Sequence, residues 1–232
     1  MVSTDVRAVA RLAVVTGALA ALLLALALAQ QGSQAVFQVV RPASQYAELL
    51  LQRASALRLE MWVDNLFLCL YAALFLLLER ALTSTAPNAS AEAGRAARIA
   101  AWALGLTALL DAAENAHILS MLAQAGAGLI PSQAAIDYQA AESQVKFLLS
   151  YVGLVALSFA LTADTWAERA LSFVLRWVQA PIGVAVFVTP QPALTWLYLM
   201  RASFFVLGLW WLAYVLLARL KAQSPAQAAL QA

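Results

Sequence analysis

Several segments of this sequence are apolar except for a few ionisable side chains, and those side chains have the types and spacing that chemistry needs. The stretch LTALLDAAENAHILSML holds Asp111, Glu114 and Asn115, spaced i, i+3, i+4. That spacing puts all three on one face of a helix. His117, the only histidine of the chain, lies about one turn beyond Glu114. An ionisable group inside a membrane span costs at least about 2.5 kcal/mol, so each one indicates a functional site with a partner.

Three other apolar segments carry similar residues. WVDNLFLCLY places Asp64 and Tyr71 seven residues apart on one side of a helix, with Asn65 on the neighbouring side. LYLMRASFF contains Arg201. AESQVKFLLS begins a further span, and its acid and base four residues apart have the order that favours an ion pair along a helix. We therefore predict that Glu142 and Lys146 pair directly, as a solvated or structural pair or, together with Asp64, as the outer gate of a carrier.

Depth links these residues. At 1.5 Å per residue, Asp64 and Lys146 lie roughly 6 Å, and Arg201 roughly 10 Å, below the outer ends of their spans. Asp111 lies roughly 20 Å from Arg98 on the inner side, and therefore in the outer half. Four spans then contribute to one polar chamber for binding or proton handling. Its candidate residues are Asp64, Asn65, Tyr71, Asp111, Glu114, Asn115, His117, Glu142, Lys146 and Arg201.

The charges of this chamber do not balance. Four acids, Asp64, Asp111, Glu114 and Glu142, face Lys146 and Arg201. A low-dielectric interior disfavours unpaired charge, so one or two carboxyls must be protonated or a cation must complete the set. The alternative is structural, since polar groups that face inward hydrogen-bond between helices. The excess of acids favours a working site.

A transition-metal site and a cofactor are not expected. His117 has no second histidine or set of thiolates beside it, although a carboxylate-bound cation stays open. The sequence has no phosphate-binding glycine loop, no GxSxG, no HExxH and no histidine pair for haem. These absences argue against ATP-driven transport, serine hydrolysis, zinc proteolysis and bis-histidine electron transfer.

The composition identifies an integral membrane protein. Of 232 residues, 64% are hydrophobic and only 11% are charged, against roughly 25% charged in soluble domains. The net charge of +2 is too small to indicate a nucleic-acid partner. A single cysteine, Cys69, excludes an internal disulfide. The expected partners are membrane lipids, a small cation or lipid-like substrate, and other membrane subunits.

The expected fold is an all-α polytopic transmembrane bundle of about six spans. A span needs about 20 apolar residues, and the segments that meet this are 12–29, 61–78, 99–122, 145–161 and 194–217. The segment 170–188 is interrupted by Arg176, Gln179 and Pro181. It is either a kinked fifth span along the chain, which makes six in all, or an interfacial helix followed by a re-entrant piece. The end of the first span also resembles a signal-peptide cleavage site, but its apolar run is long enough to stay as an anchor.

Arginine positions orient the bundle. Arg7 and Arg11, then Arg80, Arg95 and Arg98, then Arg169, then Arg219 with Lys221, all belong inside if there are six spans. The first external loop, with its own arginines, is the exception. The prediction is a multi-pass protein of a bacterial cytoplasmic (inner) membrane with both termini cytoplasmic.

Residues 1–232 form one membrane domain with three appendages. An amphipathic helix at 44–58 is expected on the outer surface, either as a lid over the chamber or as a connector resting on headgroups. Residues 82–96 are expected to form a cytoplasmic loop, and 222–232 a flexible tail.

Three functions fit these observations. The first is a carrier or permeation protein for a proton, cation or small amine. The second is a membrane-embedded enzyme that acts on a lipid or isoprenoid with carboxylates as acid and base. The third is a non-catalytic subunit or assembly factor of a membrane complex. The carrier ranks slightly ahead.

Overall fold

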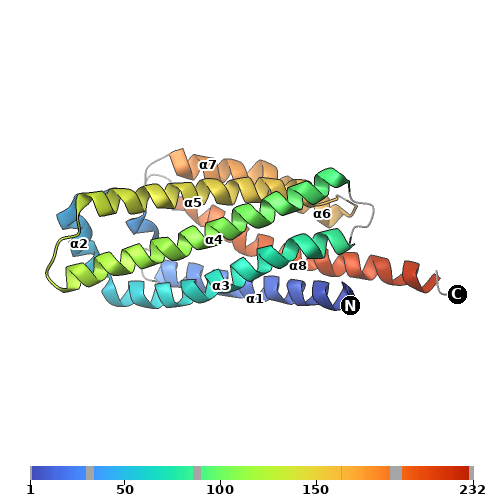
Figure 1. Ribbon diagram of the computed structural model, residues 1–232, viewed down its shortest axis with the longest axis horizontal. Coiled ribbons are helices and arrows are strands. Elements are labelled where there is room, and N and C mark those ends of the chain that lie inside the picture. Colours follow the sequence, from blue (N-terminus) through green and yellow to red (C-terminus); the bar gives the residue numbers. More distant parts are fainter. Residues whose placement is uncertain (1, 30–33, 86–89, 163, 189–194, 230–232) are drawn as a thin grey trace.

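The computed structural model of the chain is a bundle of long helices (Figure 1). It describes residues 2–29, 34–85, 90–162, 164–188 and 195–229, and within them it contains helices and no strand. The elements in chain order are α1 Val2–Ala29, the 3₁₀ turn η1 Gln34–Phe37, α2 Ala43–Gln52, α3 Ala54–Thr85, α4 Ala91–Gly126, α5 Gln133–Ala160, α6 Trp166–Val174, the π-helical turn η2 Leu175–Gln179, α7 Ala180–Val188 and α8 Thr195–Ala229.

Five of these helices, α1, α3, α4, α5 and α8, are long and apolar enough to cross a membrane. Large apolar side chains cover the outside of the bundle, as contact with lipid requires: Trp62 is 79% exposed and Leu109 67% exposed. The expectation of an all-helical membrane bundle with about five to six spans is confirmed, and the protein is a multi-pass membrane protein.

The interrupted segment forms α6, η2 and α7, which follow one another without a break in the helical path. Pro181 has no N–H for the carbonyl one turn earlier, and the helix accommodates it with the π-helical turn just before it. This bent path packs against α5 and α8. Both chain ends lie at the same end of the bundle (Figure 1).

The helices extend beyond the apolar segments on which the predicted spans rest. The expected loop at 82–96 is helical up to Thr85 and again from Ala91, where Ser90 caps α4 by accepting a hydrogen bond from Ala93 N at 3.1 Å. The expected tail at 222–232 is helical to Ala229, and its last three residues lie outside the described part. Ala, Arg, Glu and Gln favour helix without being apolar, so hydropathy alone places helix ends too early.

The expected helix at 44–58 is two elements. α2 ends at Gln52, and Ala54 already begins α3, so Leu57 belongs to the spanning helix. The apolar face of α2 holds Tyr46 and Leu50, and both are completely buried. Because α2 packs on α4, it closes one end of the bundle, and its apolar face contacts protein.

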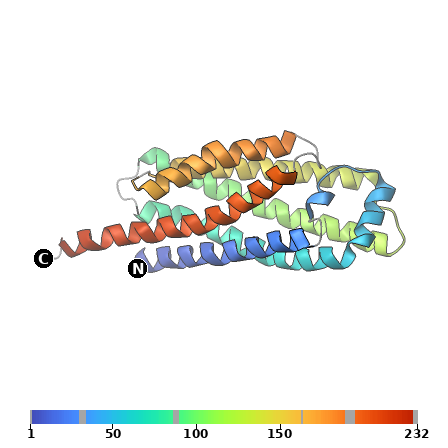
Figure 2. The same cartoon turned by 180° about the vertical axis from the view of Figure 1, so that it is seen from behind.

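Small residues let the helices approach closely. α1 runs beside α8 (Figure 2), and Gly17 lies so close to the ring of Trp210 that a Cβ there would come within 2.5 Å of it. Trp210 Nε1 donates to Val14 O at 3.3 Å across the same contact. The first span, α1, is thus closely packed against α8 as one of the helices of the bundle.

Candidate functional site

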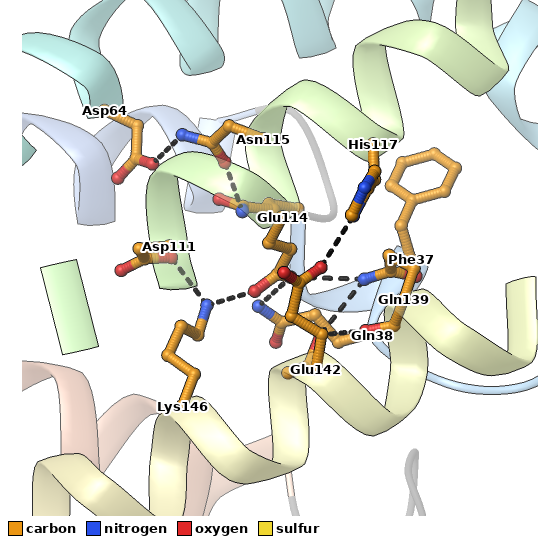
Figure 3. A network of polar contacts seen from close by, with 12 residues as sticks. Phe37, Gln38, Asp64, Asp111, Glu114, Asn115, His117, Gln139, Glu142 and Lys146 are labelled. Carbon is orange, nitrogen blue, oxygen red and sulfur yellow. Dashed lines mark hydrogen bonds and ion pairs between the residues drawn. The ribbon is translucent and has the colours of Figure 1, made fainter. Parts of the chain in front are cut away.

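A buried lysine joins α4 to α5 (Figure 3). Lys146 Nζ donates to Asp111 Oδ1 at 2.6 Å and also to Glu114 Oε2. The side chain of Lys146 is 4% exposed and that of Glu114 is 0% exposed. Asp111 and Glu114 lie one turn apart on α4, so a single ammonium group from α5 can bind both carboxylates. One positive charge therefore serves two negative ones.

Asn115 ties α3 to α4. Its Nδ2 donates to Asp64 Oδ2 at 2.6 Å and to Asn65 Oδ1 at 3.0 Å, while its Oδ1 accepts from Gln34 Nε2 at 2.7 Å. The amide is thereby oriented by partners on both sides. Asp64 receives a neutral hydrogen bond, and no cationic side chain in the described residues lies within ion-pair distance of it.

The segment after α1 supplies polar groups that sequence reasoning missed. The backbone N–H of Gln34 donates to both carboxylate oxygens of Glu60, each at 3.1 Å. Gln38 Nε2 donates to Glu114 Oε1 at 2.9 Å, and Tyr198 OH donates to Gln38 Oε1 at 3.0 Å. Glu60 was detectable, because it lies four residues before Asp64 on the same helix face. No sequence pattern indicated a role for Gln34 and Gln38, since their segment resembles an ordinary connector between helices.

α2 covers this network from the end of the bundle. Tyr46 OH donates to Gln139 Oε1 at 3.3 Å, and Gln139 Nε2 donates to Glu114 Oε1 at 3.3 Å and to Ser143 Oγ at 3.0 Å. Burial raises the pKa of Tyr46, and the negative charge of Glu114 raises it further. Tyr46 therefore stays a neutral hydrogen-bond donor.

The predicted ion pair between Glu142 and Lys146 is wrong. Glu142 Oε2 instead lies 2.7 Å from His117 Nδ1, in a contact between α5 and α4. Lys146 turns to the two acids of α4, which together outweigh one acid on its own helix. The His117 side chain is 44% exposed, so this pair lies toward the surface of the bundle.

A cavity of about 660 Å³ lies beside the network, within the size range of sites for small molecules. Its walls come from α1, the segment 34–38, α3, α4, α5 and α8, with Gln179 reaching it from η2. We call this cavity the chamber. The charged residues that line it are Glu60, Asp64, Asp111, Lys146 and Arg201.

Arg201 contributes a positive charge that is held by aromatic rings. Its guanidinium carbon lies 4.4 Å from the ring centroid of Phe147 and 4.2 Å from that of Tyr198, and Nη1 donates to Tyr151 OH at 3.2 Å. Among the described side chains, no acid lies within ion-pair distance of it. Arg201 is thus fixed by cation–π contacts, and neutralises none of the lining acids directly.

Part of the chamber lining is aromatic and aliphatic. Phe67 and Tyr71 have ring centroids 5.4 Å apart, and Phe205 lies 6.2 Å from Phe67 and 6.0 Å from Tyr71. Aliphatic side chains of α1, such as Leu23 and Leu24, complete this wall. An occupant would therefore contact carboxylates, aromatic rings and aliphatic side chains in the same cavity.

The structure divides the predicted site residues into two groups. Asp64, Tyr71, Asp111, Lys146 and Arg201 line the chamber. The others support or flank it: Asn65, Glu114, Asn115, His117 and Glu142. Within the part of the chain that the structure describes, no group of three or more His, Cys, Asp or Glu side chains is arranged to hold a metal ion.

Comparison of the chain with protein-family models, with curated proteins and with solved structures finds no match.

Proposed function

We propose that the protein is a carrier for a small organic ammonium ion, which binds in the chamber. One observation carries the proposal: the lining has more negative than positive charge. Glu60, Asp64 and Asp111 face Lys146 and Arg201, and Lys146 is already shared between Asp111 and Glu114. A buried charge without a partner is unfavourable, so a cationic occupant would stabilise the set.

The walls favour an organic ammonium over a proton or a metal ion. Phe67, Tyr71 and Phe205 present rings close to the acids, and aromatic rings together with carboxylates bind alkylated ammonium groups. A metal ion would need several oxygens converging on one point. A proton would need no cavity of this size. The chamber therefore fits a cation with an apolar body.

In alternating access, the binding site is closed to one side of the membrane while it is open to the other. The half of the bundle nearer the two termini is packed with buried apolar side chains, among them Leu74, Leu78 and Leu216. The bent path with its π-helical turn reaches the chamber through Gln179, and bends of this kind mark moving elements in transporters. Movement of this path against α5 and α8 is the opening step of the proposed cycle.

We also propose a bacterial inner membrane with both termini in the cytoplasm. The support is the distribution of arginines between loops, together with the common end of the bundle at which both termini lie (Figure 1). Fusions of reporter domains at the C-terminus and at Ala127 test this orientation, with the first expected inside and the second outside.

Uptake of radiolabelled tetraethylammonium by proteoliposomes tests the carrier function. This ion keeps its charge at every pH and does not cross lipid unaided, so uptake above that of empty liposomes requires the protein. Asp64→Asn is expected to reduce uptake about ten-fold, because it removes a lining charge with little change in shape. Asp5→Asn is the control, because Asp5 is exposed at the surface, 3.9 Å from Arg80.

The outcomes separate the alternatives. Saturable uptake that Asp64→Asn reduces supports a carrier. Binding without uptake, measured by titration calorimetry in nanodiscs, favours a membrane-embedded enzyme with the same site. Absence of both overturns the proposal.

A further inference from the structure

A second cavity, of about 280 Å³, lies between α5, the bent path and α8. It is nearer the termini than the chamber. Its walls are aliphatic and aromatic, with Phe75, Leu157, Leu171 and Leu212 as typical members. Among the described residues that line it, Gln179 is the only amide and none is charged. We call it the apolar cavity. None of the roles described above uses it.

Three residues line both cavities: Leu154 of α5, Gln179 of η2 and Phe205 of α8. The two cavities therefore adjoin at these three side chains. The two spaces therefore follow one another along the bundle, with charges at one end only.

Gln179 is the weakly held one of these three side chains. It is 3% exposed, and its Nε2 donates to Arg201 O at 3.1 Å. Its Oε1 is buried with no hydrogen-bond partner, the only such side-chain atom among the described residues. A buried amide oxygen without a donor is destabilising. Rotation of this side chain therefore loses one hydrogen bond at most, at a position where the two cavities adjoin.

We infer that the ligand is an amphiphile whose ammonium headgroup binds in the chamber and whose unbranched apolar tail passes Gln179 into the apolar cavity. This inference rests on the proposed function and adds the class of substrate. From Lys146 to Leu157 the rise along α5 is about 16 Å, so the two cavities together accept an extended chain. Beyond Gln179, the described residues of the lining include no charged side chain for a second headgroup.

The apolar cavity is expected to select ligands by the shape and length of their tails. In a bilayer the competing environment of the tail is lipid, which is as apolar as leucine, so burial gives no hydrophobic gain. Binding in the apolar cavity then depends on close packing. A side chain that fills the cavity should therefore exclude long tails and leave short ones unaffected.

Gly208 gives such a variant. It lines the apolar cavity, and a Cβ added there meets no atom within 4 Å. A Cβ is thus accommodated at this position, and Gly208→Leu is designed to extend the added side chain into the apolar cavity. The matched control is Gly94→Leu, at an equally open helical position near the start of α4.

The experiment compares butyltrimethylammonium with dodecyltrimethylammonium by titration calorimetry in nanodiscs. The ratio of wild-type to variant affinity cancels the partition of each probe into lipid. Gly208→Leu is expected to lower the affinity for the dodecyl probe about ten-fold and to leave the affinity for the butyl probe unchanged. Unchanged binding of the butyl probe also shows that the chamber of the variant is folded. Gly94→Leu should change neither. If Gly208→Leu binds each of the two probes as tightly as the wild type does, the inference is overturned while the proposed function stands.

A spectroscopic measurement keeps the test independent of Gly208. A dodecyltrimethylammonium with bromine at the tail end quenches nearby tryptophans, and Trp211 lines the apolar cavity. Saturable quenching that Trp211→Phe reduces supports the inference. Quenching unaffected by Trp211→Phe contradicts it. If the wild type binds neither probe, the proposed function fails instead.

Discussion

Two buried ion networks in this bundle differ in charge balance and in space. Near the termini, Arg219 of α8 donates to Glu168 of α6 through Nε at 2.9 Å and Nη2 at 3.1 Å, and Nη2 also donates to Thr162 Oγ1 at 3.0 Å. This arrangement, which we call the Arg219 cluster, pairs the guanidinium of Arg219 with the carboxylate of Glu168 within the part of the chain that the structure describes. The chamber at the other end has more acids than bases and a cavity beside them.

Charge balance and free volume distinguish a structural ion pair that locks helices together from a binding site. A balanced and bidentate pair satisfies its own hydrogen-bonding groups and leaves nothing for a ligand. Charges that are unbalanced beside an open volume keep part of their binding capacity. The same residue types therefore act differently at the two ends, and four substitutions test this distinction.

The largest effect is expected at the Arg219 cluster. Glu168→Gln leaves the buried charge of Arg219 without its carboxylate, and loss of one partner of a buried pair costs about 3–5 kcal/mol. The free energy of unfolding in detergent measures this, and binding of tetraethylammonium should persist. The control is Glu79→Gln at the exposed pair with Arg98, which should change stability by less than about 1 kcal/mol. Equal effects of the two substitutions would contradict the role of the cluster as a lock.

The next effect concerns the wall of the chamber. A Cβ on Gly183 would come within 2.1 Å of the ring of Tyr151, and Tyr151 accepts the hydrogen bond from Arg201. Gly183→Ala should therefore destabilise the protein by about 1–3 kcal/mol. Gly94→Ala, in open space, should stabilise it by up to about 1 kcal/mol. Thermal unfolding of both variants measures the difference, and a stabilising Gly183→Ala would refute the close packing.

In the chamber, Asp64→Asn should affect ligand affinity more than stability. Its affinity for tetraethylammonium should fall about ten-fold, which is about 1.4 kcal/mol, because a charge that serves the ligand is lost. The free energy of unfolding should change by less than about 1 kcal/mol, since Asn still accepts the hydrogen bond from Asn115. Calorimetry and unfolding on one sample measure both. A loss of stability as large as that of Glu168→Gln would make Asp64 a structural residue.

The smallest effect is expected at the cover of the chamber. Tyr46→Phe removes hydrogen bonds to Gln139 and to the carbonyl of Phe37, at about 0.5–1.5 kcal/mol. Because the pKa of Tyr46 is raised in the folded state, its contribution is complete below pH 10.0, the ordinary tyrosine value, and falls as the pH rises beyond it. Unfolding measured between neutral and alkaline pH should fall less steeply for Tyr46→Phe than for wild type. Identical slopes would contradict the burial of this hydroxyl.

The sequence was sufficient for the helical membrane bundle. Spans follow from apolar length, and the residues that share a helix face follow from the helical repeat, so both depend on local properties alone. Asp111, Glu114 and Asn115 lie on one face for the same reason. Glu60 was missed only because the predicted span began one residue too late.

Partner choice depended on the tertiary structure. The pairing of Lys146 with Asp111 and Glu114, and of Glu142 with His117, depends on how α4 and α5 face each other, which spacing within one helix does not contain. Arg219 resembles a flanking cytoplasmic charge in the sequence, yet the bent path brings Glu168 to it and buries both. Cavities likewise form between helices. The sequence thus determined the helices and the residues that share a helix face, and packing decided which of them meet, because contacts between helices depend on their relative rotation and tilt.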